Sequence, residues 1–168
     1  MAQRPDIDGP FSIRPIRASD KRALSEGLGR LSDEAVYRRF MSPKPRFSGA
    51  ELRYLTELDG WNHLALVATP ADDPDSFVAV ARFVRMPEDP ATAEFAIVVG
   101  DRYQGRGLGK CLALALADAA RERGIERFTA STLGDNVPAQ RLMASIAERM
   151  HGGRASHGVR ELELELAA

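Results

Sequence analysis

The chain of 168 residues (18.4 kDa) has the length of one domain, and its 44% hydrophobic and 28% charged residues are typical of a globular protein. Its 23 basic and 24 acidic side chains give a net charge of −1, which excludes the strong positive field of a general nucleic-acid binder. The longest apolar run, residues 111–117, is far shorter than the roughly 18 residues of a membrane span, no apolar signal sequence opens the chain, and one cysteine cannot form an intrachain disulfide. We therefore expect a soluble cytoplasmic protein without a membrane or nucleic-acid partner.

The first half of the chain predicts short elements. Residues 1–10 contain two prolines and a glycine and are expected to form a loose leader, ahead of a single domain at residues 11–168. Strands are predicted at residues 11–14, 63–69 and 77–85. Helices are predicted from Ser19–Asp20 onward, from Ser32 to about residue 41, and at 51–58. The third of these helices follows a capping box formed by Ser48 and Glu51.

The second half alternates strands with longer helices. Strands are predicted at residues 93–99, 127–133 and 159–166. Helices are predicted at residues 107–123 and from the cap Asn136 to about residue 150. The strand at 93–99 is expected to be central because polarity is scarce after Glu94, whereas the strictly alternating last strand is expected to be an exposed edge. His151 and His157 are expected in a polar loop. These elements predict an α/β (α+β) domain with a mixed sheet.

The most informative stretch, Gln104-Gly-Arg-Gly-Leu-Gly-Lys110, connects the central strand to the long helix. Three glycines at alternate positions leave main-chain N–H groups open to close approach by an anion. The first N–H groups of the following helix are unpaired and carry roughly half a positive charge. The stretch therefore predicts a phosphate or pyrophosphate site. A tight turn without a ligand is the simpler alternative.

Two common phosphate-binding patterns do not fit this stretch. A P-loop requires glycine where Gln104 stands and a hydroxyl group where Cys111 stands. A dinucleotide-binding fold requires glycine where Lys110 stands, and it places the turn after the first strand of the domain rather than after several. A nucleotide-binding module is thus the weaker alternative.

The pattern Gln-x-x-Gly-x-Gly, formed by Gln104, Gly107 and Gly109, resembles the coenzyme A pyrophosphate loop of the GNAT superfamily of N-acetyltransferases. Asn136 opens the pattern Asn-x-x-Ala-x-x-Leu, which is similar to the family's next motif. Residues 31–40 and 63–68 resemble the acetyltransferase domain of bacterial protein-lysine acetyltransferases. The resemblance extends over about residues 11–166 and implies a GNAT-like mixed central sheet of about six to seven strands flanked by about four helices.

The resemblance also implies where a cosubstrate binds. Acetyl-CoA is the implied cosubstrate, and no metal is implied. The main chain of Ile97 and Val99 would pair with the pantetheine arm as an added strand does, and Asn136 would hydrogen-bond the arm as well as cap its helix. The pyrophosphate would lie on the loop that follows Gln104, on the main chain of Gly105, Arg106, Gly107, Leu108, Gly109 and Lys110.

Glu94 is the predicted catalytic base. A lysine amine, with a pKa of about 10.4, is protonated at neutral pH, so its attack on a thioester requires a base. Glu94 resembles the catalytic glutamate of the protein-lysine acetyltransferases, and its apolar strand is expected to desolvate the carboxylate. An exposed glutamate paired with Arg82 or Arg85 is the alternative. His63 is the second candidate for a base.

The acceptor implied by the resemblance is a primary amine, which attacks directly in a ternary complex and is acetylated. A protein lysine is favoured, and a small-molecule amine is the alternative. Many family members carry a tyrosine as the general acid where this chain has Met143, so a non-catalytic acyl-CoA sensor is a further alternative. The chain is expected to be a monomer or a homodimer, in which the last strand would pair with its copy.

Overall fold

The computed structural model describes residues 11–44 and 46–167, so the predicted leader at residues 1–10 lies outside the described residues. Seven strands of the described part form one mixed sheet in the order β1-β2-β3-β4-β5-β7-β6. The strands are β1 (Phe11–Pro15), β2 (His63–Pro70), β3 (Ala79–Met86), β4 (Asp89–Val99), β5 (Arg127–Leu133), β6 (Ala147–Ser156) and β7 (Val159–Leu166). The pairing of β4 with β5 is parallel and all other pairings are antiparallel.

Five α-helices and two short 3-10 helices of the described part connect the strands. They are η1 (Ala18–Asp20), α1 (Lys21–Gly29), α2 (Asp33–Phe40), α3 (Gly49–Thr56), η2 (Asp101–Tyr103), α4 (Leu108–Glu122) and α5 (Val137–Ile146). Ser32 caps α2, and the predicted capping box of Ser48 and Glu51 is confirmed, although α3 begins two residues earlier than expected. The predicted α/β class with a mixed sheet is confirmed.

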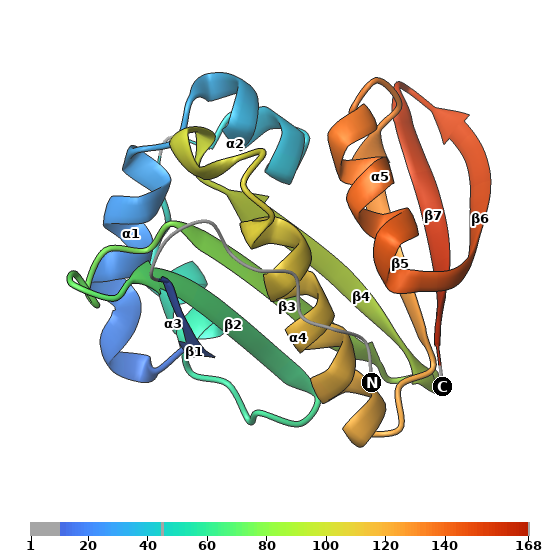
Figure 1. Ribbon diagram of the computed structural model, residues 1–168, viewed down its shortest axis with the longest axis horizontal. Coiled ribbons are helices and arrows are strands. Elements are labelled where there is room, and N and C mark those ends of the chain that lie inside the picture. The colour runs from blue at the N-terminus through green and yellow to red at the C-terminus, as the bar shows by residue number, and fades with distance from the viewer. Residues whose placement is uncertain (1–10, 45, 168) are drawn as a thin grey trace.

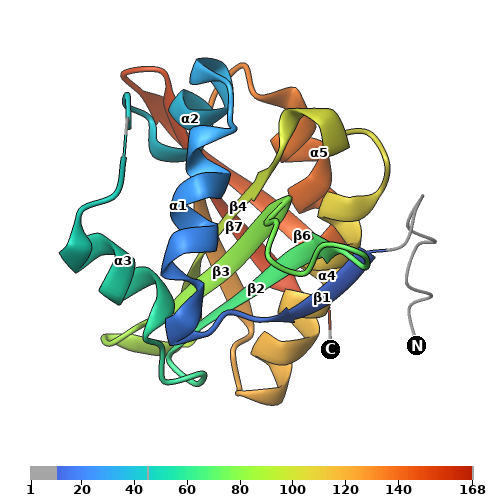
Figure 2. The same cartoon turned by 90° about the vertical axis from the view of Figure 1, so that its left-hand side faces the viewer.

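The helices cover the sheet on both faces (Figures 1 and 2). Helices α1, α2 and α3 lie on one face, where Leu24 packs with Val67 and Val80 of the sheet. Helix α4 lies on the other face, where Leu112 and Phe83 belong to the larger of the two core clusters. Burial of these apolar faces supplies the main stabilising free energy of the domain. None of the described helices combines the length and apolar character needed to cross a membrane.

Several predictions near the C-terminus are wrong. Residues 147–150 do not continue α5, and His151 does not lie in a loop: all belong to β6, which pairs antiparallel with β7. His157 and Gly158 both have positive φ, at 51° and 79°, and form the two-residue turn between these strands. Strand β7 is therefore not an edge, because β5 pairs on one side of it and β6 on the other. The predicted pairing of β7 with a second copy of the chain would require an unpaired edge, which β7 does not have.

Candidate functional site

The sheet divides between β4 and β5. These two strands pair only where Thr92–Glu94 lie beside Arg127–Thr129. From Phe95 to the end of β4, no residue of β4 pairs with β5. Figure 1 shows β4 and β5 diverging from that point, with α5 beside the opening on the β5 side. The end of the central strand thus has a neighbour on one side only.

The main-chain groups of Ile97 and Val99 face this opening. The N–H of Gly100 donates to the carbonyl of Val78 at 2.8 Å, so even-numbered residues at this end of β4 bond to β3. In an antiparallel pair the intervening residues point their N–H and C=O groups away from that neighbour. Gln104 Nε2 donates to the Val99 carbonyl at 3.1 Å from the open side. The opening is therefore lined by main-chain groups that an extended ligand can pair with.

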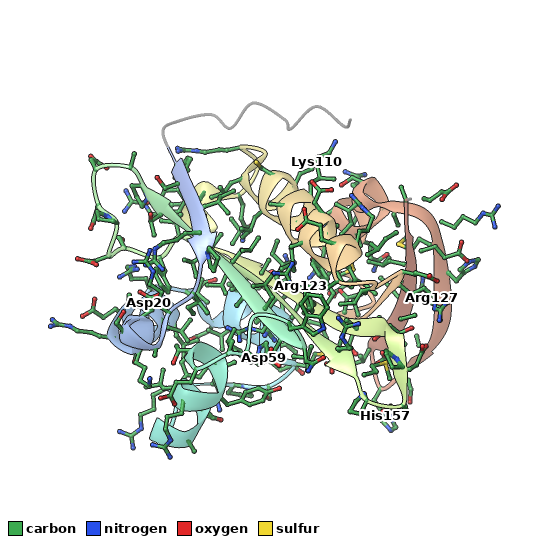
Figure 3. The ribbon with its side chains drawn as sticks, turned by 90° about the horizontal axis from the view of Figure 1, so that it is seen from below. Asp20, Asp59, Lys110, Arg123, Arg127 and His157 are labelled. Atoms are coloured by element: carbon green, nitrogen blue, oxygen red, sulfur yellow. The ribbon has the colours of Figure 1, made fainter. Side chains whose placement is uncertain are left out.

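The glycine-rich turn lies between this opening and α4. Gly105 and Gly107 have φ of +75° and +80°, a region that L side chains rarely adopt, which explains glycine at both positions. Gly107 is the N-cap of α4 and offers no side chain to its first N–H groups. Figure 3 labels Lys110 near the start of the same helix, which has 15 residues. A helix end with free N–H groups and an adjacent cation attracts an anion.

Gly109 allows α4 to lie close to β4. A Cβ atom at this position would stand 3.2 Å from Val99 Cγ2 and 3.7 Å from Leu142 Cδ2. Both neighbours line the cavity at the opening, so a side chain at residue 109 would fill it. The side chain of the preceding Leu108 points the other way and is fully buried in the core. The absent side chain of Gly109 therefore keeps the opening wide enough for a ligand.

A cavity of about 230 Å³ joins these features. It is lined by residues from α2, β4, the glycine turn and α5: Ala35, Arg38, Arg39, Ile97, Val98, Val99, Tyr103, Gln104, Gly105, Gly109, Asn136, Pro138, Ala139 and Leu142. Six of the ten predicted cosubstrate residues are brought together here. The other four, Arg106, Gly107, Leu108 and Lys110, belong to the same turn but do not line the cavity. The lining residues of α2 and Tyr103 were not among the predicted cosubstrate residues, whereas Ala139 and Leu142 belong to the Asn-x-x-Ala-x-x-Leu pattern.

Asn136 caps α5 from inside this cavity. Its Oδ1 accepts from the N–H of Ala139 at 3.3 Å, and 8% of the residue is exposed. The predicted cap is confirmed. The side-chain amide donors of Asn136 have no protein partner in the described hydrogen bonds, so they stay available at the cavity wall.

Glu94 lies on the central strand as predicted, but its side chain is exposed, so the expected desolvation of the carboxylate is wrong. The physical reason is its place at the point where β5 leaves β4, on the face that α2 covers only partly. Its neighbour on β3 is Val84, and neither Arg82 nor Arg85 makes an ion pair with it. Burial lowers the pKa of the Arg39 guanidinium in α2, and the negative charge of Glu94 offsets part of that lowering.

His63 has a role in holding Arg82. The ring nitrogen Nε2 lies 3.1 Å from Arg82 Nη1, which also donates to the carbonyl of Leu55 at 3.2 Å. Burial first, and the charge of Arg82 second, lower the pKa of His63 to about 4. The ring is therefore neutral at pH 7 and accepts from Arg82. A base of such low pKa is a poor match to an amine at neutral pH.

The position of the missing tyrosine does not face the cavity. Met143 is 4% exposed and packs in the core cluster that includes α4, whereas the preceding Leu142 lines the cavity. The described residues contain no cluster of three or more side chains suited to a metal ion.

Comparison with known proteins places this geometry in context. The model of the acetyltransferase (GNAT) family matches residues 34–146. Acetyltransferase Pat from Mycolicibacterium smegmatis is 40% identical over 134 residues, which are 79% of this chain and 39% of that protein. The crystal structure of the GNAT domain of PAT from S. lividans matches with a TM-score of 0.81 and 34% identity, covering 92% of this chain and 89% of that one. The structure of yncA from Salmonella typhimurium with its cofactor acetyl-CoA has the same fold, with a TM-score of 0.73 at 20% identity over 95% of both chains. The chain spans about two fifths of the length of the curated relative Pat.

Proposed function

Because the chain belongs to the acetyltransferase (GNAT) family, we propose that it binds acetyl-CoA and transfers the acetyl group to a primary amine in a ternary complex. The observation that carries the proposal is the opening between β4 and β5, with free main-chain groups along β4 and free N–H groups at the start of α4. A thioester with a flexible amide-bearing arm and a pyrophosphate complements both features. The expectation of a cytoplasmic protein remains a prediction.

The chemistry of the residues at the opening supports coenzyme A as the ligand. Ile97 and Val99 would pair with the amides of the pantetheine arm, and Asn136 would donate its side-chain amide to the same arm. The turn from Gly105 to Lys110 would hold the pyrophosphate through its main-chain N–H groups. The space that a Cβ atom of Gly109 would occupy is part of this path.

Transfer begins when the neutral amine attacks the thioester carbonyl carbon. The new C–N bond forms and gives a tetrahedral oxyanion, which a main-chain N–H near Val99 would stabilise. Glu94, directly or through water, would accept the proton that the amine loses. Collapse of the oxyanion breaks the C–S bond, and the amide and coenzyme A are the products.

The departing thiolate takes its proton from water in this proposal. A thiol has a pKa of about 8.5, so its anion leaves far more readily than an alkoxide and does not depend on a protein acid. Met143, buried in the core, does not bear on this step. A non-catalytic acyl-CoA sensor is the competing function, because the chain offers no tyrosine at that position.

Calorimetry with acetyl-CoA, ATP and NAD, followed by a thiol-release assay over a panel of amines and lysine peptides, tests the proposal. Of the three ligands, we expect only acetyl-CoA to give a binding heat, and we expect thiol release with at least one amine. Glu94→Gln is expected to lower kcat by about 100-fold or more, in the range of general-base catalysis, with acetyl-CoA affinity within twofold of wild type. Binding without release for any acceptor, and no effect of Glu94→Gln, would identify the sensor instead.

The place of binding is tested by Gly109→Ala. The added methyl group enters the path at 3.2 Å from Val99 Cγ2, so we expect the dissociation constant of acetyl-CoA to rise about tenfold, a loss of roughly 1.4 kcal/mol. Gly29→Ala in α1 is the matched control, because no atom lies within 4 Å of its new Cβ. Equal affinities of the two variants would move the binding site elsewhere.

A further inference from the structure

A second cavity, of about 260 Å³, lies between the sheet and helices α1, α2 and α3. Figure 2 shows these helices over the face of the sheet that forms its floor. Most of its walls are apolar, including Leu24, Leu28, Phe47, Phe77, Val80 and Val98. A cavity of this size and character suits the carbon chain of a small molecule.

This cavity adjoins the opening between β4 and β5. Arg39, Val98 and Tyr103 line both spaces. Ala96 and Val98 line its floor, and Glu94 shares their face of β4 because side chains alternate along a strand. A molecule in this cavity would therefore meet the thioester end of the opening from the face on which Glu94 lies.

Two arginines of the described cavity lining make no ion pair. Arg82 is 6% exposed, and its described partners, the carbonyl of Leu55 and the neutral ring of His63, carry no charge. The Arg39 guanidinium carbon lies 4.8 Å from the ring centroid of Phe40. Neither guanidinium has a carboxylate within 4.0 Å among the residues that the structure describes. Burial, and then the charge of Arg39, lower the pKa of Arg82 to about 10, so Arg82 is still protonated at neutral pH.

The carboxylates near this cavity either have other partners or are exposed. Asp101 is the only acidic residue in the described lining of this cavity, and its two oxygens accept from the N–H and the hydroxyl of Ser32 at 3.1 and 2.7 Å. Glu34 of α2 pairs with Arg38 at 2.8 Å. Glu94 acts on Arg39 through its charge but is exposed. Four arginines and one aspartate line the cavity, so an anion is the complementary occupant.

We propose that this cavity is the acceptor site and that it takes a small aliphatic amine that also carries a carboxylate, the carboxylate pairing with Arg39 and Arg82. This inference rests on the proposed function and narrows its acceptor to one of the two classes left open. Two poorly solvated cations that make no ion pair are costly, and a carboxylate relieves that cost through charge-assisted hydrogen bonds. The apolar walls take the carbon chain, and the amine is left to face the opening.

Matched pairs of amines test the inference in the thiol-release assay. We would compare 5-aminopentanoate with pentylamine and L-leucine with 3-methylbutylamine, and add a lysine peptide with blocked termini. The second amine of each pair lacks the carboxylate, which a methyl group replaces in pentylamine and a hydrogen atom replaces in 3-methylbutylamine. At least one carboxylate-bearing amine is expected to exceed its partner at least tenfold in kcat/KM, and to exceed the peptide. A smaller ratio in both pairs, or a preference for the peptide, overturns the inference while leaving acetyl transfer intact.

Variants of α2 test whether Arg39 is responsible for the preference for carboxylate-bearing amines. Arg39→Gln is expected to reduce the tenfold preference to below twofold. Arg38→Gln, one residue away and already neutralised by Glu34, is expected to keep the preference. Equal effects of the two variants overturn the assignment of the carboxylate to Arg39.

A binding measurement keeps the inference testable without catalysis. NMR titration of the enzyme and coenzyme A with 5-aminopentanoate is expected to shift the Nε–H resonances of Arg39 and Arg82. Pentylamine is expected to leave them in place. Shifts without any acetyl transfer would contradict the proposed function but support this site, whereas unshifted resonances in both titrations overturn the site.

Discussion

Lowering the pH from 7.5 to 5 is expected to destabilise the folded domain through His63. In the unfolded chain this ring takes up a proton near pH 6.5, whereas burial and the charge of Arg82 keep it neutral in the fold until the pH nears its lowered pKa of about 4. The unfolded state therefore binds more protons in this range, and acid favours unfolding. At pH 5 the two pKa values correspond to a loss of about 2 kcal/mol, against almost none at pH 7.5.

Urea unfolding of wild type and His63→Gln at pH 7.5, 6 and 5 measures this loss. Glutamine does not titrate, and its side-chain oxygen preserves an acceptor for Arg82. With a slope of about 2 kcal/mol per molar urea, the wild-type midpoint should fall by about 1 M more than that of the variant between pH 7.5 and 5. The difference between the two proteins isolates the contribution of residue 63. If the urea midpoints of the two proteins change in parallel across this range, the half-buried ring is not kept neutral, and the hydrogen bond that holds Arg82 is refuted as well.

Substitutions at three further residues test individual contacts of the fold. Asn136→Ala should lower the free energy of unfolding by about 1 kcal/mol through loss of the α5 cap, and Asn136→Ser should restore stability but not acetyl-CoA affinity, as urea melts and calorimetry would report. Asp20→Asn should cost about 2 kcal/mol in urea unfolding, because Asp20 accepts two hydrogen bonds from Arg14 at 2.7 and 2.9 Å and is buried. Asp101→Ala should free Ser32 and speed amide hydrogen exchange in α2 relative to α4, while uniform exchange would argue against Asp101 as its tether.

Features encoded within a few consecutive residues were predictable from the sequence. The capping box of Ser48 and Glu51, the cap Asn136 and the glycine turn depend on local hydrogen bonds and backbone angles, and the structure contains all three. The role of the main-chain groups of Ile97 and Val99 was implied only by the family resemblance. The register of β4 explains why these groups face away from β3 and have no partner on β5.

Strand β6 was missed because its residues have no apolar alternation. Its sequence, Ala-Glu-Arg-Met-His-Gly-Gly-Arg-Ala-Ser, contains charged residues and two consecutive glycines, which weaken a strand prediction. The strand forms because β7 offers an unpaired edge, and the turn at His157 and Gly158 returns the chain along it. A histidine followed by glycine, bordered by a strictly alternating segment, was the available indication of a hairpin.

The sequence by itself determined the class of the domain, the glycine-rich turn and the family, because these depend on local patterns of glycine, caps and apolar spacing. Only the tertiary structure decided the exposure of Glu94, since exposure depends on where β5 leaves β4. It alone also brought Arg39 of α2 and Arg82 of β3 into one cavity in which neither makes an ion pair with a described carboxylate. Charge balance in a cavity is a property of neighbours in space, and residues on different elements acquire it only when the chain is folded.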